Sequence, residues 1–424
     1  MKILLVHNFY GSSAPSGENT VFEAERQMLA SYNETVEVFT RHSDEIRGGT
    51  SDQKWGIKKK TWGLLKGALC TIMNPFAARA LVKKCREFKP DVVHFHNTFP
   101  LISPFAVRAA SKCAPVVMTL HNYRMVCAAG IPMRDGMVCR ECFDLKVKSC
   151  DCLIGDVAEG IKQSQISNQT ILPAIKHRCY RGSLLATIPL AINIWLYRNL
   201  LLHWVSCFVV LSEFQKARMI ECGILAEKIA VKGNFVTNQL LSSGHSPRSG
   251  AIYVGRLSDE KGVMVMLHAW KLLGNEAPHL KIIGDGDMRV KYEAEVERLA
   301  MVEKIEFMGQ RSPGFVRRAL SESVFSILPS EWWETFGLTV VESLIEGTPC
   351  VVTDLGALPS IVTNDCGVVC KASDAPGLAA AIRKLMSADW NRMSSAAKAR
   401  AAEFSEVKNY QQLLEIYQGV GVKI

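Results

Sequence analysis

Residues 329–342 read Pro-Ser-Glu-Trp-Trp-Glu-Thr-Phe-Gly-Leu-Thr-Val-Val-Glu and follow the apolar run Val324–Leu328. This pattern predicts a buried strand, a loop and a helix that begins near Phe336. Glu334 and Glu342 are eight residues apart, which places their carboxylates ~12 Å apart along a helix axis. That separation is about the length of a diphosphate with a sugar at one end and a ribose at the other.

The start of this predicted helix offers an anion site between the two acids. Free backbone amides at a helix N-terminus attract phosphate, and Gly337 allows a ligand to approach the backbone closely. Each carboxylate can accept hydrogen bonds from a pair of hydroxyl groups. The alternative is that Glu334 is a loop acid and Glu342 an ordinary surface residue of the helix.

A second segment, Gly-Arg-Leu-Ser-Asp-Glu-Lys-Gly at residues 255–262, also follows an apolar run. A strand that leads into a glycine turn and then a helix is typical of phosphate binding. Arg256 can bind phosphate oxygens in bidentate fashion, and Lys261 adds a second positive charge. Two cations and a helix terminus can stabilise a departing diphosphate without a metal ion. The alternative is a loop held by salt bridges to Asp259 or Glu260.

A third segment, Gly-Asp-Gly-Asp-Met-Arg at residues 284–289, again follows an apolar run. Asp285 and Asp287 superficially resemble an acidic pair that binds a metal ion. Because the pair lies between glycines, we interpret it as turn geometry and helix capping instead.

Short β-branched apolar runs alternate with helical periods along the 424 residues, which predicts parallel sheets joined by crossover helices. Thr237–Gly250, rich in Ser, Gly and Asn, divides the runs into two sets. We therefore expect an α/β protein with two facing, Rossmann-like, doubly wound domains over residues 1–240 and 241–402. A helix over residues 403–424 would cross back onto the first domain. The apolar runs are Ile3–Val6, Val36–Thr40, Val92–Phe95, Val116–Leu120, Phe208–Leu211, Ala251–Val254, Leu280–Ile283, Lys304–Met308, Val324–Leu328 and Cys350–Thr353.

The positive charge is concentrated in the first half of the chain. The net charge is +9, and residues 1–240 hold 30 Lys and Arg against 19 Asp and Glu. This excess favours an anionic membrane surface or a phosphate-bearing lipid as partner. Nucleic acid is not expected, because no base-stacking or groove-reading motif accompanies the basic residues. The alternative is a solvated basic face without a partner.

Three features indicate the compartment. The apolar run Met1–Val6 is too short for the core of a signal peptide. The 14 cysteines, without a secretory signal, are typical of a reducing environment. The most hydrophobic stretch, Leu184–Leu211, is interrupted by Arg198 and His203, so we expect a buried or interfacial helix instead of a membrane span. We expect a cytoplasmic protein that associates peripherally with the inner face of the cell membrane.

Six cysteines fall within residues 127–179, inside a stretch over 124–181 that we interpret as an insert in the first domain. Four thiolates bind structural zinc tetrahedrally, and Cys127, Cys139, Cys142 and Cys179 are the candidate ligands. Only Cys139 and Cys142 form a C-x2-C pair, and the alternative is a set of reduced thiols without metal. The remaining two are Cys150 and Cys152.

The three second-half segments, in this order and spacing, resemble the retaining glycosyltransferases of family 4, which have the GT-B fold. The paired glutamates resemble the E-x7-E motif of that family, and Arg256 and Lys261 match its phosphate-binding pair. In the first half, Asp-Val-Val-His-Phe-His-Asn at residues 91–97 and Thr-Leu-His-Asn-Tyr-Arg at residues 119–124 resemble strand ends of its first domain.

The resemblance implies a set of donor contacts. Glu342 would hold the ribose hydroxyls, and Glu334 would hold the donor sugar. The donor set named by the resemblance also contains Arg256, Lys261, Gly284, Phe336, Gly337 and Leu338.

The resemblance also implies contacts from the first domain. His121 would lie near the sugar and its phosphate, and would act in catalysis with Glu334, Arg256 and Lys261. Residues 15–18, Pro-Ser-Gly-Glu, stand where the family often has a Gly-Gly pattern, of which only Gly17 matches. Gly17, His96 and Asn97 would line the acceptor or phosphate loop.

The implied reaction is the transfer of a sugar from a UDP- or GDP-linked donor to a glycan or lipid-linked acceptor in cell-surface polysaccharide synthesis, without a catalytic metal. Retention by double displacement needs a carboxylate nucleophile ~5 Å from the acid, and no residue is an obvious candidate. We therefore expect same-face attack, in which the leaving phosphate takes the acceptor proton. The alternatives are a nucleotide-sugar epimerase of similar fold and a non-catalytic scaffold that binds nucleotide sugars.

Overall fold

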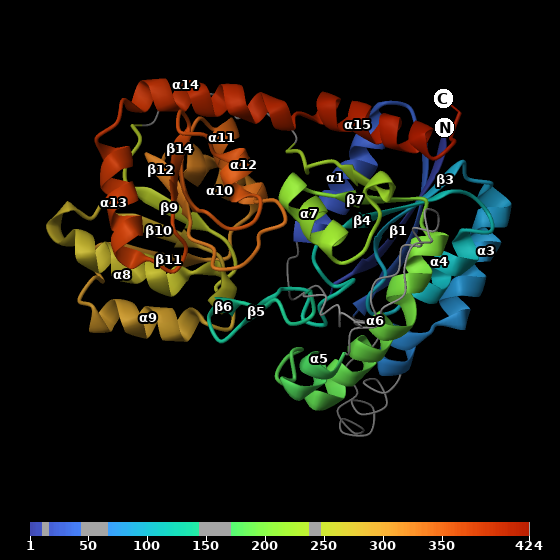
Figure 1. Ribbon diagram of the computed structural model, residues 1–424. Coiled ribbons are helices and arrows are strands. Elements are labelled where there is room, and N and C mark those ends of the chain that lie inside the picture. Colours follow the sequence, from blue (N-terminus) through green and yellow to red (C-terminus); the bar gives the residue numbers. More distant parts are fainter. Residues whose placement is uncertain (11–16, 44–66, 144–170, 237–246, 424) are drawn as a thin grey trace, which may run out of the picture. The chain divides into compact units, whose positions relative to one another are not determined.

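The computed structural model describes residues 1–10, 17–43, 67–143, 171–236 and 247–423. The chain divides into two compact units. Unit 1 comprises Met1–Pro132, Cys139–Lys232 and Tyr410–Ile424, and unit 2 comprises Met133–Val138 and Gly233–Asn409. Figure 1 labels the elements of both units.

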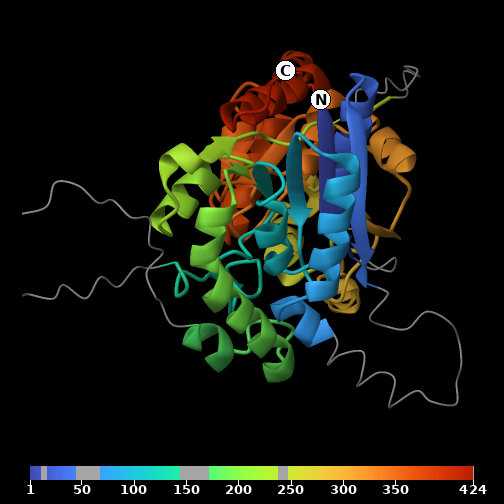
Figure 2. The same cartoon turned by 90° about the vertical axis from the view of Figure 1, so that its right-hand side faces the viewer.

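Unit 1 is built on a six-stranded parallel sheet in the order β2-β1-β3-β4-β7-β8. The central strands are buried on both faces, which is why they read as continuous apolar runs instead of alternating ones. Figure 2 shows β1 and β2 side by side in blue. The strands are β1 (Lys2–Phe9), β2 (Thr35–His42), β3 (Val92–Asn97), β4 (Val116–Leu120), β7 (Cys207–Val210) and β8 (Ile229–Val231). The helices are α1 (Gly17–Ser31), α3 (Pro75–Phe88), α4 (Pro104–Ala110), α5 (Leu172–Lys176), α6 (Leu184–Trp204), α7 (Glu213–Glu221), η3 (Ala226–Lys228) and α15 (Glu406–Gly419).

Unit 2 repeats this plan with a second six-stranded parallel sheet, in the order β11-β10-β9-β12-β13-β14. Its strands are β9 (Ala251–Val254), β10 (Leu280–Ile283), β11 (Ile305–Gly309), β12 (Phe325–Leu328), β13 (Cys350–Thr353) and β14 (Gly367–Cys370). Its helices are η4 (Asp259–Lys261), α8 (Val263–Leu273), η5 (Gly274–Glu276), α9 (Arg289–Arg298), α10 (Pro313–Ser321), α11 (Leu338–Ile345), α12 (Leu358–Ile361), α13 (Ala375–Met386), α14 (Trp390–Ala401) and η6 (Ala402–Phe404).

The two parallel sheets confirm the predicted α/β fold class. Each sheet also contains one strand that the apolar runs did not indicate, β8 in unit 1 and β14 in unit 2. Both are edge strands of three or four residues. An edge strand pairs with one neighbour only, and short strands are common at that position.

A small antiparallel hairpin, β5 (Met133–Arg134) and β6 (Met137–Val138), lies within the stretch that we interpreted as an insert. Gly136 has a φ of +75° and Asp135 a φ of +53°, which is the left-handed backbone of a tight hairpin turn. The hairpin separates Cys127 from Cys139. Of the predicted insert, residues 144–170 lie outside the described residues.

Helix α6 is the one helix in the described parts of the chain whose length and apolar composition would allow a membrane span. Of its most apolar window, 39% is buried inside the protein. Arg198 and Thr187 are among its buried residues, whereas Leu185 and Trp195 are exposed. The helix is therefore partly packed against unit 1 and partly presents apolar side chains outward.

The C-terminal helix α15 packs within unit 1 from Tyr410 onward. The rings of Tyr410 and Tyr32 stack at a centroid distance of 3.9 Å, and the Tyr410 hydroxyl donates to Glu34. Further along the helix, the Tyr417 hydroxyl lies 2.8 Å from Nδ1 of His94. Helix α15 thus contacts the central strand β3 of the unit 1 sheet.

Candidate functional site

Three loops meet at the carboxyl ends of β9, β10 and β12 in unit 2. Gly284 has a φ of +138°, and a Cβ there would overlap the carbonyl oxygen of Gly255. Gly262 has a φ of +67°, and a Cβ there would overlap the carbonyl oxygen of Pro329. Each glycine is therefore required for backbone contact as well as for its φ value. The structure thus brings together the three segments singled out in the sequence.

Lys261 and Glu334 form the central ion pair of these loops. Lys261 Nζ lies 2.5 Å from Glu334 Oε1, and the Ser330 hydroxyl donates to the same oxygen at 2.6 Å. Both charged side chains are largely buried, with 16% and 6% of their surface exposed. Burial acts to raise the pKa of Glu334, but Lys261 and the hydrogen bonds from neighbouring donors hold it below the usual value. Glu334 is therefore an anion whose countercharge is Lys261.

Arg256 lies at the surface of the same loop. Its Nη2 is 2.9 Å from Glu260 Oε1, and 57% of its side chain is exposed. The salt-bridged loop that we weighed as the alternative is thus present for Arg256. Only 13% of the Glu260 side chain is exposed, and its Oε1 also accepts from the Ser258 hydroxyl at 2.7 Å, so Arg256 is the solvent-facing member of the pair.

The segment that contains Glu334 and Glu342 ends in helix α11 (Leu338–Ile345). Gly337, the N-cap residue, has a φ of +111°. The Phe336 ring is buried and packs edge-on against Phe404, and a Cβ on Gly233 would contact it at 2.7 Å. The ring therefore belongs to the core of unit 2, and only the backbone around Gly337 can contribute to a ligand site. At the start of α11 the Val340 amide donates to the Gly337 carbonyl oxygen at 3.0 Å, whereas the amides of Leu338 and Thr339 precede the first hydrogen bond of the helix.

Glu342 lies in the second turn of α11. Burial raises its pKa to about 7, and the nearby Arg317 opposes this rise. The side chain is neither fully buried nor fully exposed. Glu342 therefore titrates close to neutral pH, unlike Glu334.

Asp285 stabilises its own turn. Its Oδ1 accepts from the Gly286 amide at 2.8 Å, and Oδ2 pairs with Arg289 at 3.3 Å. The expectation of turn geometry is correct, but that of helix capping is wrong. The N-cap residue of α9 is Met288, which makes no side-chain capping bond.

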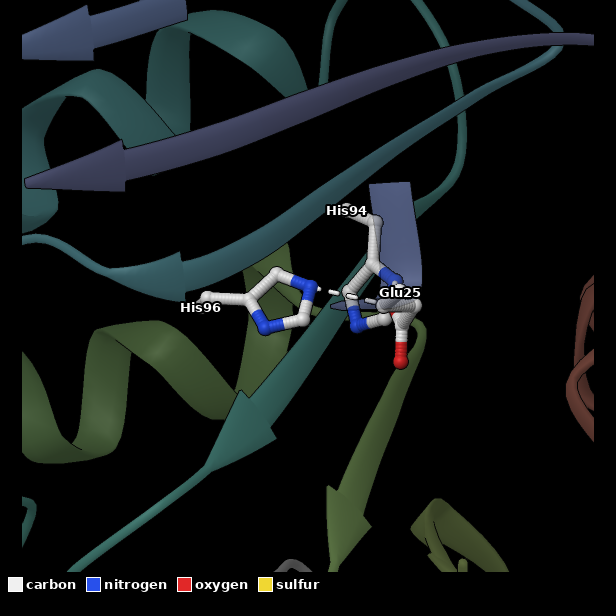
Figure 3. Close-up of side chains that lie close together, drawn as sticks. All are labelled: Glu25, His94 and His96. Atoms are coloured by element: carbon white, nitrogen blue, oxygen red, sulfur yellow. Dashed lines mark hydrogen bonds and ion pairs between the residues drawn. The ribbon is translucent and has the colours of Figure 1, made fainter. Parts of the chain in front are cut away.

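A second cluster of polar side chains lies in unit 1 at the ends of β3 and β4. Glu25 of α1 places Oε1 3.0 Å from His96 Nε2 and 3.2 Å from His94 Nδ1 (Figure 3). Its other oxygen lies 2.9 Å from Lys232 Nζ. His96 Nδ1 lies 3.1 Å from His121 Nε2. The predicted residues His96 and His121 are therefore linked to a buried ion pair.

Burial governs the charges in this cluster. Burial lowers the pKa of His94 to about 4 and that of His7 to about 3. It also holds the pKa of His121 well below its usual value, with help from the neighbouring His96 and His7. Burial would raise the pKa of Glu25, but Lys232 and the two histidines hold it well below the usual value. At neutral pH Glu25 is ionised, and His7, His94 and His121 are uncharged.

Gly17 and Asn97 have structural positions in unit 1. Gly17 is the first residue of α1, and a Cβ there would meet nothing within 4 Å. Asn97 Nδ2 donates to the Asn8 carbonyl at 2.9 Å, and its Oδ1 accepts from the Phe99 amide at 2.9 Å. Asn97 therefore fixes the loop after β3. Pro15 and Ser16 lie outside the described residues.

The four candidate zinc ligands do not take part in a disulfide, and all lie in unit 1. Burial raises the pKa of Cys142 to about 12, and the nearby Cys127, Cys139 and Cys179 add to the rise. Within the described ranges, the one group of three ligand atoms within 4.8 Å of one another is Glu25, His94 and His96. The thiols are thus neighbours without being drawn together as in a zinc site, and zinc remains a prediction. Cys150 and Cys152 lie outside the described residues.

Glu25 and Lys232 were not among the residues predicted from the sequence, and His94 was predicted only as part of the segment 91–97. A signal for Glu25 was available, because it shares the spacing of the apolar residues of α1. Val21, Phe22, Met28 and Leu29 are buried on the same face, and an acid in such a stripe needs a buried partner. Nothing in the sequence near Lys232 identifies it as that partner.

Two family models match the chain. The family described as "Glycosyl transferases group 1" matches residues 246–404, and "Glycosyltransferase Family 4" matches residues 16–134. The chain is 30% identical over 168 residues to a glycogen synthase of Mycobacterium tuberculosis, which is 38% of this chain and 40% of that protein. It is 28% identical over 191 residues to a phosphatidyl-myo-inositol mannosyltransferase of Mycolicibacterium smegmatis, which is 42% and 48% of the two chains. These matches span less than half of the relatives' length.

The fold is similar to that of solved structures over nearly the whole chain. The crystal structure of Anabaena Alr3699/HepE in complex with UDP and glucose superposes with a TM-score of 0.62 and 17% identity, covering 99% of both chains. This likeness establishes the GT-B type of α/β fold.

Proposed function

The chain belongs to glycosyltransferase family 4, and we propose that it transfers a sugar, with retention of configuration, from a nucleotide-diphosphate donor to a glycan or lipid-linked acceptor. One observation carries the proposal. Lys261, Glu334 and the first turn of α11 lie together in unit 2. The loops that carry them pack closely because Gly262 and Gly284 have no side chain. A cation, an anion and free helix amides at one place suit a diphosphate bonded to a polyhydroxylated sugar.

The donor is assigned to residues of unit 2. Lys261 and Arg256 bind the diphosphate, Glu334 and the backbone around Gly337 bind the sugar, and Glu342 binds the ribose. Gly284 lets the loop after β10 approach closely enough to complete the site. UDP or GDP is the nucleotide. UDP is supported by the UDP complex of the Anabaena protein, and GDP by relatives described as GDP-mannose-dependent mannosyltransferases.

Charge stabilisation is the main catalytic contribution of the unit 2 residues. When the bond between sugar and phosphate breaks, negative charge grows on the leaving diphosphate, and Lys261, Arg256 and the α11 amides stabilise it. The acceptor attacks from the face that the diphosphate leaves, and its proton passes to a phosphate oxygen. The bond from anomeric carbon to phosphate oxygen is replaced by a bond to the acceptor oxygen, so atoms and charge balance.

We assign a lipid-linked glycan as the acceptor. Unit 1 is the part of the protein that binds the anionic membrane in which this acceptor lies. A groove of about 860 Å³ between α3 and α4 is lined by Arg86, Lys89, Arg108 and Lys112. Exposed apolar side chains lie on α3, which carries Phe76, and on α6, which is joined to this region by a hydrogen bond from Asn193 to Thr71. Basic and apolar side chains on neighbouring helices favour binding to anionic lipid.

Transfer of label separates this function from its alternatives. Purified protein is incubated with radiolabelled UDP- and GDP-sugars and a membrane extract. Label in the lipid fraction supports the transferase. A changed free nucleotide sugar would show the epimerase instead, and retention of an unaltered donor on the protein without turnover would show the scaffold.

A further inference from the structure

Glu25 is a buried carboxylate with both oxygens occupied. Oε2 pairs with Lys232 Nζ at 2.9 Å, and Oε1 lies within 3.2 Å of both His96 Nε2 and His94 Nδ1 (Figure 3). The Glu25 and Lys232 side chains are 1% and 2% exposed. These residues come from α1, from β3 and from the end of β8. A further hydrogen bond joins His96 to His121, so that the four residues Lys232, Glu25, His96 and His121 form a hydrogen-bonded chain.

A metal ion is the first alternative, because Glu25, His94 and His96 offer three ligand atoms close together. However, the ammonium group of Lys232 already neutralises the same carboxylate. His94 also uses both ring nitrogens, Nδ1 with the Tyr417 hydroxyl and Nε2 with the Thr119 hydroxyl, each at 2.8 Å. A divalent cation beside a buried ammonium would be strongly repelled, so the geometry favours a chain of hydrogen bonds.

The chemistry of Lys232 and Glu25 determines which atom donates in each hydrogen bond of this chain. Lys232 can only donate, and the ionised Glu25 can only accept. Glu25 and Lys232 together are neutral, so a proton on both nitrogens of His96 would add an uncompensated buried charge. His96 is therefore neutral and donates from Nε2 to Glu25. Its Nδ1 must then accept, and the donor is His121 Nε2–H.

We propose that Glu25, Lys232 and His96 are positioning residues that hold His121 in the Nε2–H tautomer, so that His121 Nδ1 can act only as a hydrogen-bond acceptor. The role of this tautomer in sugar binding rests on the proposed glycosyltransferase function. An acceptor nitrogen favours the hydroxyl groups of a sugar over phosphate oxygens, which also only accept. The low pKa of His121 agrees with this, since an imidazolium would donate from both nitrogens.

The tautomer can be observed directly by NMR. The full-length protein, labelled with ¹⁵N at its ten histidines, gives long-range ¹H–¹⁵N correlations that distinguish a protonated ring nitrogen from an unprotonated one. His121→Gln assigns the His121 signals by their loss. We expect His121 in the wild type to be protonated at Nε2 and unprotonated at Nδ1.

Glu25→Gln should reverse the direction of the hydrogen bonds from residue 25 to His121. An NH2 group facing the Lys232 ammonium would set two donors against each other, so the carboxamide oxygen of the new side chain faces Lys232 and its NH2 group faces His96. That NH2 donates to His96 Nε2, His96 then carries its proton on Nδ1, and His121 becomes the Nδ1–H tautomer. Sugar transfer should fall by about 10–100-fold, the usual effect of removing a group that orients a site residue. Glu37→Gln, which removes an exposed partner of Lys84, should change neither the tautomer nor the rate.

Several results would overturn the inference. One is a wild-type His121 that is protonated at Nδ1 or at both nitrogens, and this result stands even where Glu25→Gln fails to fold. Another is a folded Glu25→Gln protein with an unchanged His121 tautomer. A third is a stoichiometric metal whose removal shifts the His94 and His96 signals. Failure of the proposed function would appear separately, as absence of transfer by a wild type whose His121 has the expected tautomer.

Discussion

Glu342 is the acid of the candidate donor site whose charge changes near neutral pH. Its pKa is raised to about 7 because the folded protein buries it. The ionised form is therefore disfavoured in the folded state. As pH rises from about 4.5 to 7, Glu342 lowers the free energy of unfolding. The Glu334 carboxylate behaves oppositely, since its lowered pKa keeps it charged over that range.

This difference predicts the pH dependence of donor binding. Ribose hydroxyls donate more strongly to a carboxylate than to a carboxylic acid, so affinity for a nucleotide sugar should rise between pH 6 and pH 8. The phosphates of a nucleotide sugar do not titrate in this range, which leaves Glu342 as the expected cause. Calorimetric titration should show the rise in the wild type and its loss in Glu342→Gln. A Glu342→Gln protein with unchanged affinity and pH dependence would contradict the ribose assignment.

At the scale of elements, the donor loops depend on glycines that permit backbone contact. Gly284→Ala would place a Cβ onto the Gly255 carbonyl at a φ of +138°, and such strain costs about 1–3 kcal/mol. We expect a lower melting temperature and a weaker affinity for the donor. Gly314→Ala in α10 is the matched control, because a Cβ there meets nothing within 4 Å. Equal behaviour of the two variants would refute the close approach of these loops.

The hairpin β5–β6 and the cysteines around it form the second element to test. We propose that Cys127, Cys139, Cys142 and Cys179 bind one structural zinc, which would draw their thiols together and deprotonate them. Metal analysis of purified protein should then find about one zinc per chain, lost in a Cys139→Ser, Cys142→Ser double variant. A metal-free protein in which all four thiols react with a thiol reagent would remove zinc from this account.

At the scale of the whole molecule, unit 1 is proposed as the membrane-binding part. The protein should bind vesicles that contain anionic phospholipid and leave those of neutral lipid unbound, with binding that weakens as salt rises. Replacing Arg86 and Lys89 of the α3–α4 groove by Gln should weaken vesicle binding about 30-fold, at roughly 1 kcal/mol per basic residue. Sedimentation with vesicles measures this. Equal binding to neutral and anionic vesicles would exclude the electrostatic part of the proposal.

The sequence predicted the fold class well because both sheets are parallel. Strands such as β1 and β9 are buried on both faces and appear as continuous apolar runs. The polar and glycine-rich segments that directly follow the predicted strands also indicated which strand ends carry the candidate site residues. Edge strand β14, which reads Gly-Val-Val-Cys, is a short apolar run that was not included among the predicted strands.

The pairing of distant charges could not be predicted from the sequence. Glu25 and Lys232 are 207 residues apart and meet only after the sheet of unit 1 is complete. Their contact depends on the order of strands, which no local pattern encodes. The same holds for Lys261 and Glu334, whose ion pair forms between loops from different strands.

The central claim is that positive charge and helix amides of unit 2 bind the diphosphate of a nucleotide sugar. Calorimetric titration of UDP- and GDP-sugars into the wild type, Arg256→Ala, Lys261→Met and Arg298→Ala tests it most directly, with circular dichroism to verify folding. Arg298 is an exposed partner of Glu295 and serves as control. We predict that the wild type binds at least one donor and that each of the first two variants binds it about 10–100-fold more weakly, as expected for a lost charged hydrogen bond, while Arg298→Ala is unchanged. Undiminished binding by folded Arg256→Ala and Lys261→Met proteins would contradict the account.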